Sequence, residues 1–465
     1  MHSAGRPTAA LAALILAAAC GPAQAQAPAD PQRMPPHDPA GTSAGEPAGP
    51  RLLDLVTLRA ASIVQRSLPF RSPYAGANSL PGTGETRGSQ SVVLGLGKRL
   101  ASTLQAFVDL RWLTGSGVGA ENGLAAYANG DFSMGARVSG PYVLRAYLRG
   151  WRALGDADDP VDRDEDQIAG REPAERLEWK AGRILPTDDF DRLRYASNVL
   201  TEFLNLGLVN NPAWDNAQNA RGTTDGLYAA WIRRRWELRA GSYRMPRTAN
   251  GPVLDADFGR ARSDQVELTV KAADSFDDGP VLRVLAFRNT ARMGRYRAAT
   301  AAAAGTGLPP SAAADEAPGR LKRGATLNLE WPLADAGETA LFACAGANDG
   351  RTEDFSFTEA DRNACVGAQL SGRRFGRADD RVGLALLVSA LSAPHRDYLG
   401  AGGLGFQLGD GRLRYGPERV VELYWRVQLA RAVALSPDVQ WIANPGFNRD
   451  RGPARIVSLR LVLSF

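Results

Sequence analysis

Residues that could carry out hydrolytic or metal-assisted chemistry are scarce in this chain. It has three histidines, and two of them, His2 and His37, lie near the N-terminus. The third, His395, could act as a general base only beside a serine hydroxyl. The acidic run at 155–167 could attract calcium, but it lacks the central glycine and closing glutamate of an EF-hand loop, so a solvated turn is favoured. We expect no enzymatic activity, no cofactor and no metal site.

Charged residues instead alternate with apolar ones, which is typical of a strand that has one polar and one apolar face. Residues 419–429 set Val421 and Leu423 against Glu422 and Tyr424. Charges in the middle of a strand suit a water-filled barrel interior. Strand phase and one long loop give the residues that we expect to line the path of a solute: Arg145, Arg149, Glu178, Lys180, Arg192, Arg194, Trp214, Glu237, Arg239, Glu422, Tyr424, Arg426, Asp438, Gln440 and Arg460.

The same alternation recurs along the chain, in segments at 235–243, 263–272, 324–333, 433–442 and 455–465. A soluble β-sandwich also alternates, but here short connections follow long ones in turn, as in outer-membrane barrels. The connection at 152–175 breaks this rule, because it is long on the short-turn side. We predict an all-β fold: a transmembrane, antiparallel, up-and-down β-barrel of about 16 strands, with long external loops and short periplasmic turns.

The N-terminus predicts export. Residues 1–25 combine one early arginine, a short apolar stretch and an Ala-Gln-Ala cleavage site, which is the pattern of a signal peptide. Cys20 leaves lipoprotein processing open as an alternative. Residues 26–52 are rich in proline, alanine and glycine and predict a disordered periplasmic lead-in. The barrel domain is expected to span 53–465, and the mean hydropathy of −0.25 agrees with strands that face both lipid and water.

Among the long loops, the one at 187–223 is the best candidate for a constriction. Its apolar middle has helical spacing, and polar residues flank it, so we expect it to fold inward against the wall. An external lid with the same packing is the alternative. The loop at 392–418 is a second candidate, and the alanine-rich loop at 295–318 is expected to be flexible.

The C-terminal strand raises a further expectation. The last strand ends on outward-facing Leu461, Leu463 and Phe465, which we interpret as an assembly signal.

Cys344 and Cys365 fall on adjacent strands, nearly symmetrical about the connecting loop. Export to an oxidising compartment makes a disulfide between them plausible; two free thiols are the alternative.

Five stretches resemble one known family, the carbohydrate-selective porins of the OprB type. They are FRSPYAGANSL (70–80), FRNTARMG (287–294), FSFTEADR (355–362), SGRRFGRADDRVGLAL (371–386) and DVQWIANPGFNRDRGP (438–453). The resemblance spans about 55–465. It implies a 16-stranded channel in the outer membrane of a Gram-negative bacterium that passes neutral sugars such as glucose.

The expected partners are small sugars, outer-membrane lipid and the barrel-assembly machinery, with no nucleic acid, and the barrel is expected to be a monomer or a homotrimer. The net charge of +5 and the pI near 9.2 support an alternative. A basic lumen would favour anions, as in a general or anion-preferring porin for carboxylates or phosphate. A barrel enzyme that uses His395 is a third and less favoured alternative.

Overall fold

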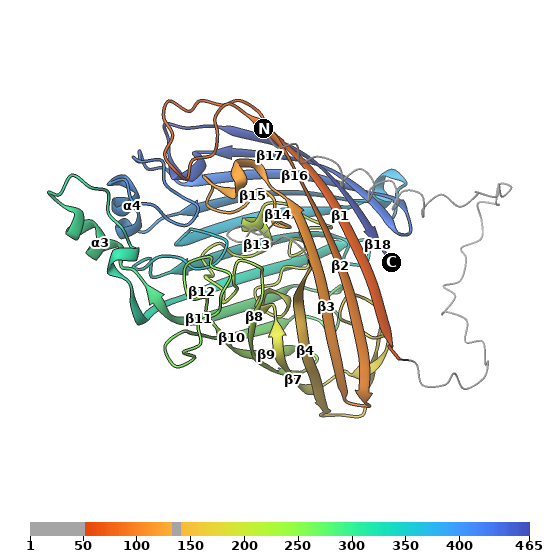
Figure 1. Cartoon of the computed structure of the whole chain (residues 1–465). Helices are drawn as coiled ribbons and strands as arrows, with labels where there is room; N and C mark the ends of the chain where they lie inside the picture. The colour runs from red at the N-terminus through yellow and green to blue at the C-terminus, as the bar shows by residue number, and fades with distance from the viewer. Residues whose placement is uncertain (1–51, 133–140) are drawn as a thin grey trace. The chain divides into compact units, whose positions relative to one another are not determined.

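A computed structural model describes residues 52–132 and 141–465. Sixteen antiparallel strands close into one barrel, as Figure 1 shows, in the order β1-β18-β17-β16-β15-β14-β13-β12-β11-β10-β9-β8-β7-β4-β3-β2. The barrel strands are β1 (Leu55–Ser67), β2 (Glu85–Ala101), β3 (Leu104–Gly115), β4 (Tyr142–Ala153), β7 (Arg176–Ile184), β8 (Thr224–Ile232), β9 (Trp236–Arg244), β10 (Arg262–Lys271), β11 (Val281–Met293), β12 (Ala317–Ala334), β13 (Thr339–Asn348), β14 (Arg362–Ser371), β15 (Arg381–Ala390), β16 (Glu418–Ala430), β17 (Val433–Ala443) and β18 (Ala454–Ser464). The predicted fold class is confirmed.

The first and last barrel strands close the sheet. β1 pairs with β18 in a register that sets Arg59 opposite Ser464 and Ser67 opposite Ile456. The terminal residue takes part in this seam: the amide of Phe465 donates to the carbonyl of Leu58 at 2.9 Å. Closure leaves no unpaired sheet edge, which a lipid environment requires.

Connections alternate in length around the barrel. One end has short turns, such as 102–103 between β2 and β3 and 431–432 between β16 and β17, and we call it the turn side. The other end, the loop side, has long connections, including 185–223 and 391–417. This pattern agrees with the sequence prediction and with outer-membrane barrels.

Two connections differ from a plain turn or a flexible loop. Between β4 and β7, the turn side has a small separate hairpin of β5 (Asp158–Val161) and β6 (Gly170–Pro173). The loop expected to be flexible contains α3 (Tyr296–Ala303), which packs against α4 (Ala393–Gly400) at the loop side, at the left of Figure 1. Tyr296 is fully buried there, so packing of this aromatic ring orders an otherwise alanine-rich segment.

Helical structure is otherwise short. It comprises α2 (Leu206–Val209) and the 3-10 turns η1 (Val118–Glu121), η2 (Pro186–Asp188), η3 (Ala313–Asp315), η4 (Gly372–Phe375) and η5 (Pro445–Phe447). Among the described residues, no helix has the length and apolar character needed to cross a membrane, a finding that does not bear on crossing by strands.

The outer face of the barrel is apolar. Leucine and valine alternate outward along the strands, for example Val266, Leu268 and Val270 on β10, each 43–48% exposed. Tryptophan side chains gather outward near the turn side of four strands, at Trp179, Trp231, Trp331 and Trp425. Tryptophan rings favour the membrane–water interface, so this ring of indoles marks one edge of the membrane-embedded band.

The packed core lies inside the barrel, between the wall and segments that enter from the loop side. Phe203 from the β7–β8 connection meets Tyr424 on β16 edge-to-face, with ring centroids 4.9 Å apart. Phe190 from the same connection packs against Tyr228 on β8 and Tyr243 on β9. The lumen is therefore partly filled by protein rather than open along its full width.

Candidate functional site

The β7–β8 connection, residues 185–223, folds into the barrel, and we call it the inward loop. Its middle hydrogen-bonds to the inner face of β16 and β17. Glu422 accepts hydrogen bonds from the backbone amides of Leu204 and Asn205, and the Asn205 side chain donates to Gln440 at 3.1 Å. The expected inward fold is confirmed, and the alternative, an external lid, is not what the structure has.

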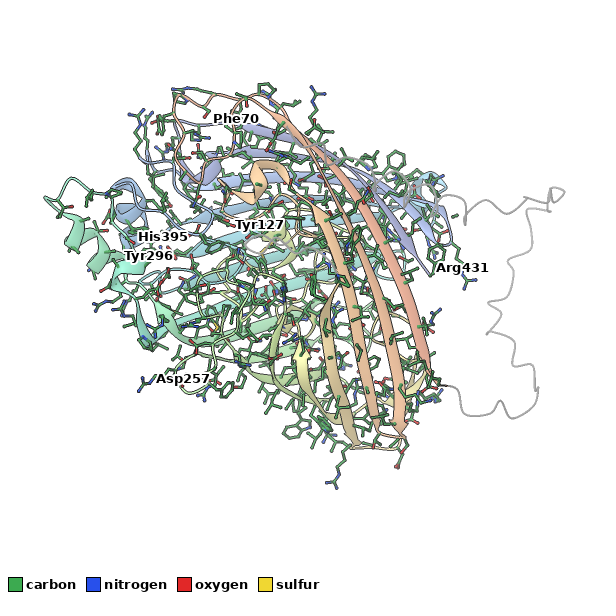
Figure 2. The ribbon with its side chains drawn as sticks, viewed as in Figure 1. Phe70, Tyr127, Asp257, Tyr296, His395 and Arg431 are labelled. Carbon is green, nitrogen blue, oxygen red and sulfur yellow. A yellow bond between two sulfur atoms is a disulfide. The ribbon has the colours of Figure 1, made fainter. Side chains whose placement is uncertain are left out.

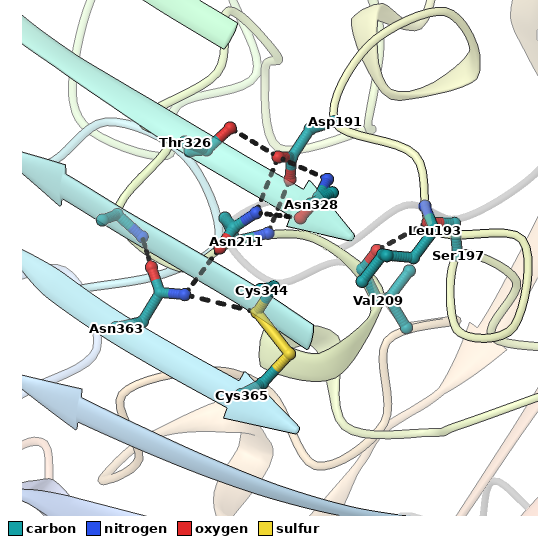
Figure 3. Close-up of a disulfide and its surroundings, with 11 residues drawn as sticks. Asp191, Leu193, Ser197, Val209, Asn211, Thr326, Asn328, Cys344, Asn363 and Cys365 are labelled. Carbon is teal, nitrogen blue, oxygen red and sulfur yellow. Dashed lines mark hydrogen bonds between the residues drawn. A yellow bond between two sulfur atoms is a disulfide. The ribbon is translucent and has the colours of Figure 1, made fainter. Parts of the chain in front are cut away.

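A second set of contacts holds Asp191 and Asn211, which flank the middle of the inward loop, as Figure 3 shows. Asp191 accepts from the amide and side chain of Asn211, and from Thr326 on β12. Asn211 also donates to Asn328 at 2.8 Å and accepts from Asn363 on β14 at 2.6 Å. These bonds replace the water that the buried loop backbone has lost, as a segment inside a barrel requires.

The inward loop also reaches the turn side. Arg194 forms an ion pair with Asp277 in the β10–β11 turn, and Tyr195 donates to the carbonyl of Gly337 in the β12–β13 turn at 2.8 Å. The loop therefore spans the lumen from end to end and divides it. One part is occupied by the loop itself against β12–β18, and the other contains an open chamber.

The chamber has a volume of about 480 Å³. This size is typical of small-molecule sites, which measure about 300–1,000 Å³. Its walls come from β1–β4 and β7, the β3–β4 connection, the inward loop and the β4–β7 connection. Among the described residues, six basic side chains line it: Arg59, Arg111, Arg145, Arg149, Lys180 and Arg192. Seven acidic side chains of the described residues line it: Asp131, Asp164, Glu165, Asp166, Glu178, Asp188 and Asp189.

Most of these charges are paired. Arg145 lies 2.7 Å from both Asp109 and Asp188, and Arg149 lies 2.6 Å from Glu172 and 2.8 Å from Glu178. Fork-shaped guanidinium groups held by carboxylates on several sides have little freedom to move. The wall is therefore rigid and highly polar.

Some polar atoms on the chamber wall have no hydrogen-bond partner in the described part of the chain. Trp214 Nε1 and Asn210 Nδ2 are donors of this kind, and Asn216 Oδ1 and Asp189 Oδ2 are acceptors. A buried polar atom without a partner costs about 1–3 kcal/mol. All four atoms are buried from solvent, so they lie behind the chamber surface.

The structure divides the residues predicted to line the solute path into three groups. Six line the chamber: Arg145, Arg149, Glu178, Lys180, Arg192 and Trp214. Glu237 and Arg239 pair with each other on β9, beside the chamber, and Arg194 faces the turn side. The remaining six lie on β16, β17 and β18, which follow β1 around the barrel, and none of them lines the chamber: Glu422, Tyr424, Arg426, Asp438, Gln440 and Arg460.

At least three residues of the last group hold the inward loop. Arg460 on β18 donates to the carbonyls of Val199 and Glu202, the latter at 2.7 Å, and Glu422 and Gln440 bind the loop as described above. Their side chains point inward, as strand phase predicted, but they contact protein. Any contact of these residues with solute stays a prediction.

Sequence reasoning missed several chamber residues, including Arg59, Arg111 and Asp131. Arg111 on β3 bonds to Asp131 at 2.7 Å. Arg59 has the inward phase of β1, but its neighbours on that face are Ala61 and Ile63, which are buried against protein. With apolar residues on both faces, alternation in β1 does not distinguish lumen from lipid, so no signal singled out Arg59.

Cys344 on β13 and Cys365 on β14 are directly opposite each other, with Cα atoms 4.8 Å apart, and the structure joins their sulfur atoms (Figure 3). Both side chains are buried on the inner face, where Asn363 donates to Cys344 Sγ at 3.6 Å. The bond lies beneath the inward loop, close to the network around Asn211.

His395 is packed inside the protein and has the environment of a structural residue. It is fully buried in α4, its ring stacks on Tyr296 with centroids 4.2 Å apart, and its Nδ1 lies 3.2 Å from Asp361 (Figure 2). The nearby Ser392 hydroxyl donates to the carbonyl of Gly350 rather than to the imidazole. The arrangement supplies no exposed nucleophile for an acyl-transfer site.

The same place holds the one group of potential metal ligands found among the described residues. Asp354, Asp361 and His395 bring three ligand atoms within 4.8 Å of one another. The buried ammonium of Lys322 already forms an ion pair with Asp354 and lies 3.4 Å from Asp215. Because a lysine supplies the compensating positive charge, we assign this cluster to loop packing.

Comparisons with known proteins agree with this geometry. No curated protein sequence matches the chain. The OprB structure of Pseudomonas putida determined at high pH superimposes with a TM-score of 0.66 at 15% identity, covering 88% of this chain and 94% of that one. The low-pH form of that protein gives a TM-score of 0.46 at 12% identity over 88% and 92% of the two chains. The channel DcaP of Acinetobacter baumannii gives 0.47 at 9% identity over 88% and 96%.

The first of these similarities supports the barrel fold, and the sequence itself supports the family. The family model described as "Carbohydrate-selective porin, OprB family" matches residues 126–465, which is most of the chain and includes four of the five stretches that suggested it. The chain belongs to the OprB family of carbohydrate-selective porins.

Proposed function

We propose that this protein is an outer-membrane channel for passive diffusion of neutral sugars, from glucose-like monosaccharides to short oligosaccharides, and that the chamber selects the solute. The proposal rests chiefly on the chamber, whose wall presents both hydrogen-bond donors and acceptors. A sugar hydroxyl both donates and accepts, so one sugar ring can bond to basic and acidic side chains of this wall together. A carboxylate offers acceptors alone.

Charge balance supports the same solute class. The chain has a net charge of +5, but the described chamber wall has six basic and seven acidic side chains. A pore selects by the charge of its lining rather than by that of the whole chain. The chamber therefore gives no attraction to anions, which argues against an anion-preferring porin for carboxylates or phosphate.

Aromatic rings can assist. Tyr147 lines the chamber, and the Lys180 ammonium lies 5.5 Å from the centroid of its ring. The ring of Trp214 is packed in protein behind the same wall. Flat apolar faces of sugars pack against such rings, while the surrounding charges bind the hydroxyl groups.

The cellular setting is part of the same proposal. A signal peptide at 1–25 would direct export, and the lead-in at 26–52 would lie in the periplasm; apart from Leu52, both fall outside the described residues. The turn side would then face the periplasm, with outer-membrane lipid around the barrel. Assembly would use the barrel-assembly machinery, and the barrel would work as a monomer or as a homotrimer of independent pores.

The test is ion conductance of the purified protein in a planar bilayer, titrated with glucose, maltose and a small dicarboxylate. We expect saturable block by the sugars and weak block by the dicarboxylate. Block by the dicarboxylate alone, with strong anion selectivity, would move the function to an anion porin. A protein that conducts nothing would overturn the channel proposal and return attention to His395.

A variant identifies the site. Arg192→Gln removes an exposed guanidinium from the chamber wall, so we expect glucose block to weaken about tenfold, in line with the loss of one charge-assisted hydrogen bond. Arg455→Gln makes the same change at an exposed position of β18 that does not line the chamber, and it should leave the block unchanged. Equal behaviour of the two variants would remove Arg192 from the site.

A further inference from the structure

The β4–β7 connection, residues 154–175, enters the barrel from the turn side, although its acidic sequence predicted a solvated turn. The correction rests on its contacts with the wall. Glu172 is buried and lies 2.6 Å from Arg149 on β4, and Arg99 on β2 donates to the carbonyl of Ala169. A solvated turn would make no such contacts with inward-facing arginines.

The tip of this connection is anchored to the wall and closed by its own backbone hydrogen bonds. Ile168 is buried in an apolar cluster with Leu55, Phe107 and Tyr147, all on the inner wall. Asp164 and Gln167 form a bridge across the tip, with backbone N–O distances of 3.2 and 3.3 Å. The tip is thus a packed element of the lumen and holds a defined position.

Four consecutive residues of the tip line the chamber: Asp164, Glu165, Asp166 and Gln167. Glu165 forms an ion pair with Arg59 on β1, and Asp166 lies 3.0 Å from Arg145 on β4. The chamber therefore has protein on two sides, with the inward loop on one and this tip on the other.

The tip also makes the chamber more negative. Among the described residues, three of the seven acidic side chains on the wall belong to the tip, and six basic side chains line the same wall. Two further carboxylates, Asp109 and Glu172, already pair with Arg145 and Arg149. Removal of the three charges of the tip would therefore make the lining more positive by three and more favourable to anions.

We propose that residues 164–167 form a second, turn-side constriction, and that Asp164, Glu165 and Asp166 are specificity-determining residues that keep the channel from favouring anions. This inference deepens the proposed function, because it says why a chain with a positive net charge can pass neutral sugars. It concerns ion selectivity as well, so it can be tested without any sugar.

The first experiment compares two charge-matched triple variants by reversal potential in a salt gradient. Asp164→Asn with Glu165→Gln and Asp166→Asn should shift selectivity toward anions about tenfold, as expected when three charges leave a narrow polar pore. The control, Asp156→Asn with Asp158→Asn and Asp159→Asn, changes the same acidic run at positions that are exposed and absent from the chamber wall. A shift of equal size in both variants, or in neither, would overturn the proposal.

A second variant changes no charge and avoids loss of the ion pairs. Gln167→Cys, labelled with a bulky thiol reagent after insertion in the bilayer, should lose most of its conductance because the label occupies the constriction. Full conductance after complete labelling would overturn the proposal, even if the triple variant failed to assemble.

The experiments can disprove the sugar proposal and the turn-side constriction independently of each other. If the triple variant becomes anion-selective while wild-type channels are blocked by dicarboxylate and not by glucose, the sugar proposal falls and the turn-side constriction stands. If glucose blocks the wild type and the triple variant keeps its reversal potential, the constriction falls and the sugar proposal stands.

Discussion

Asn205 donates its backbone amide to Glu422 Oε2 at 3.0 Å, although the two residues are 217 positions apart in the sequence. Through this bond and its neighbour from Leu204, one carboxylate on β16 caps two consecutive amides of the inward loop. Leaving a buried amide without its acceptor costs about 1–3 kcal/mol. Glu422 is therefore a positioning residue that keeps the lumen divided.

We expect Glu422→Ala to release the inward loop and Glu422→Gln to have a smaller effect, since glutamine keeps one acceptor. Loss of both bonds should weaken loop anchoring by about 3 kcal/mol or more, giving higher conductance, more current noise and faster uptake of large sugars in liposome swelling. Glu237→Gln is the matched control, because Glu237 pairs with Arg239 and Lys271 on the wall. Unchanged conductance and noise in Glu422→Ala would show that other contacts suffice.

Loop-side packing should weaken as the pH rises, through Glu359. Its Oε2 accepts the amides of Gln407 and Leu408 at 2.9 and 2.8 Å, and burial raises the pKa of Glu359 to about 7. The folded state then binds more protons than the unfolded state between pH of about 4.5 and about 7, so its stability falls across that window. The total contribution is at most about 3 kcal/mol.

Hydrogen exchange of residues 391–417 at pH 5 and pH 8, corrected for the intrinsic pH dependence of exchange, measures this effect. Wild-type protein should exchange faster at pH 8, and Glu359→Gln should remove the difference, because glutamine keeps a neutral acceptor. Glu175→Gln, on the turn side, should behave like wild type. The same pH difference in Glu359→Gln would assign the effect to another group.

The disulfide between Cys344 and Cys365 should be present in protein isolated from an oxidising compartment. Thiol counting on unreduced, denatured mature protein should find neither of these two cysteines free. Closing a loop of about 20 residues stabilises by about 3 kcal/mol in the chain-entropy model, so Cys344→Ala with Cys365→Ala should lower the temperature at which the barrel unfolds in detergent. Two free thiols in the unreduced wild type would contradict the bonded state.

The barrel could be predicted from the sequence because its outer and inner faces meet different surroundings. In segments such as 419–429, one face meets lipid and the other meets water or polar protein, so period-two alternation is strong. Turn lengths add a second, independent signal. These two patterns are local, which is why fold class and strand number followed without any structure.

The chamber could not be predicted in the same way, because its wall depends on long-range contacts. β1 has apolar residues on its inner face, since Ile63 and Ala61 pack against protein inside the barrel. The acidic connection at 154–175 looks solvated until Arg59, Arg145 and Arg149 are seen to surround it. Strand phase predicts whether a side chain points into or out of the barrel. It does not predict whether that side chain then contacts a loop of the protein or water.

Phe465 should act in assembly more than in stability of the finished barrel. Its backbone closes the seam with Leu58, while its ring is 57% exposed on the outer face. Phe465→Ala keeps the backbone pairing and removes the aromatic terminus, so we expect a several-fold lower yield of folded protein in the outer membrane and a nearly unchanged unfolding temperature for the molecules that do fold. Val457→Ala, on the same strand and equally outward, loses apolar surface without altering the terminus and should assemble normally. If both variants lose yield alike, the strand's apolar face carries the signal; if neither does, Phe465 has no role in assembly.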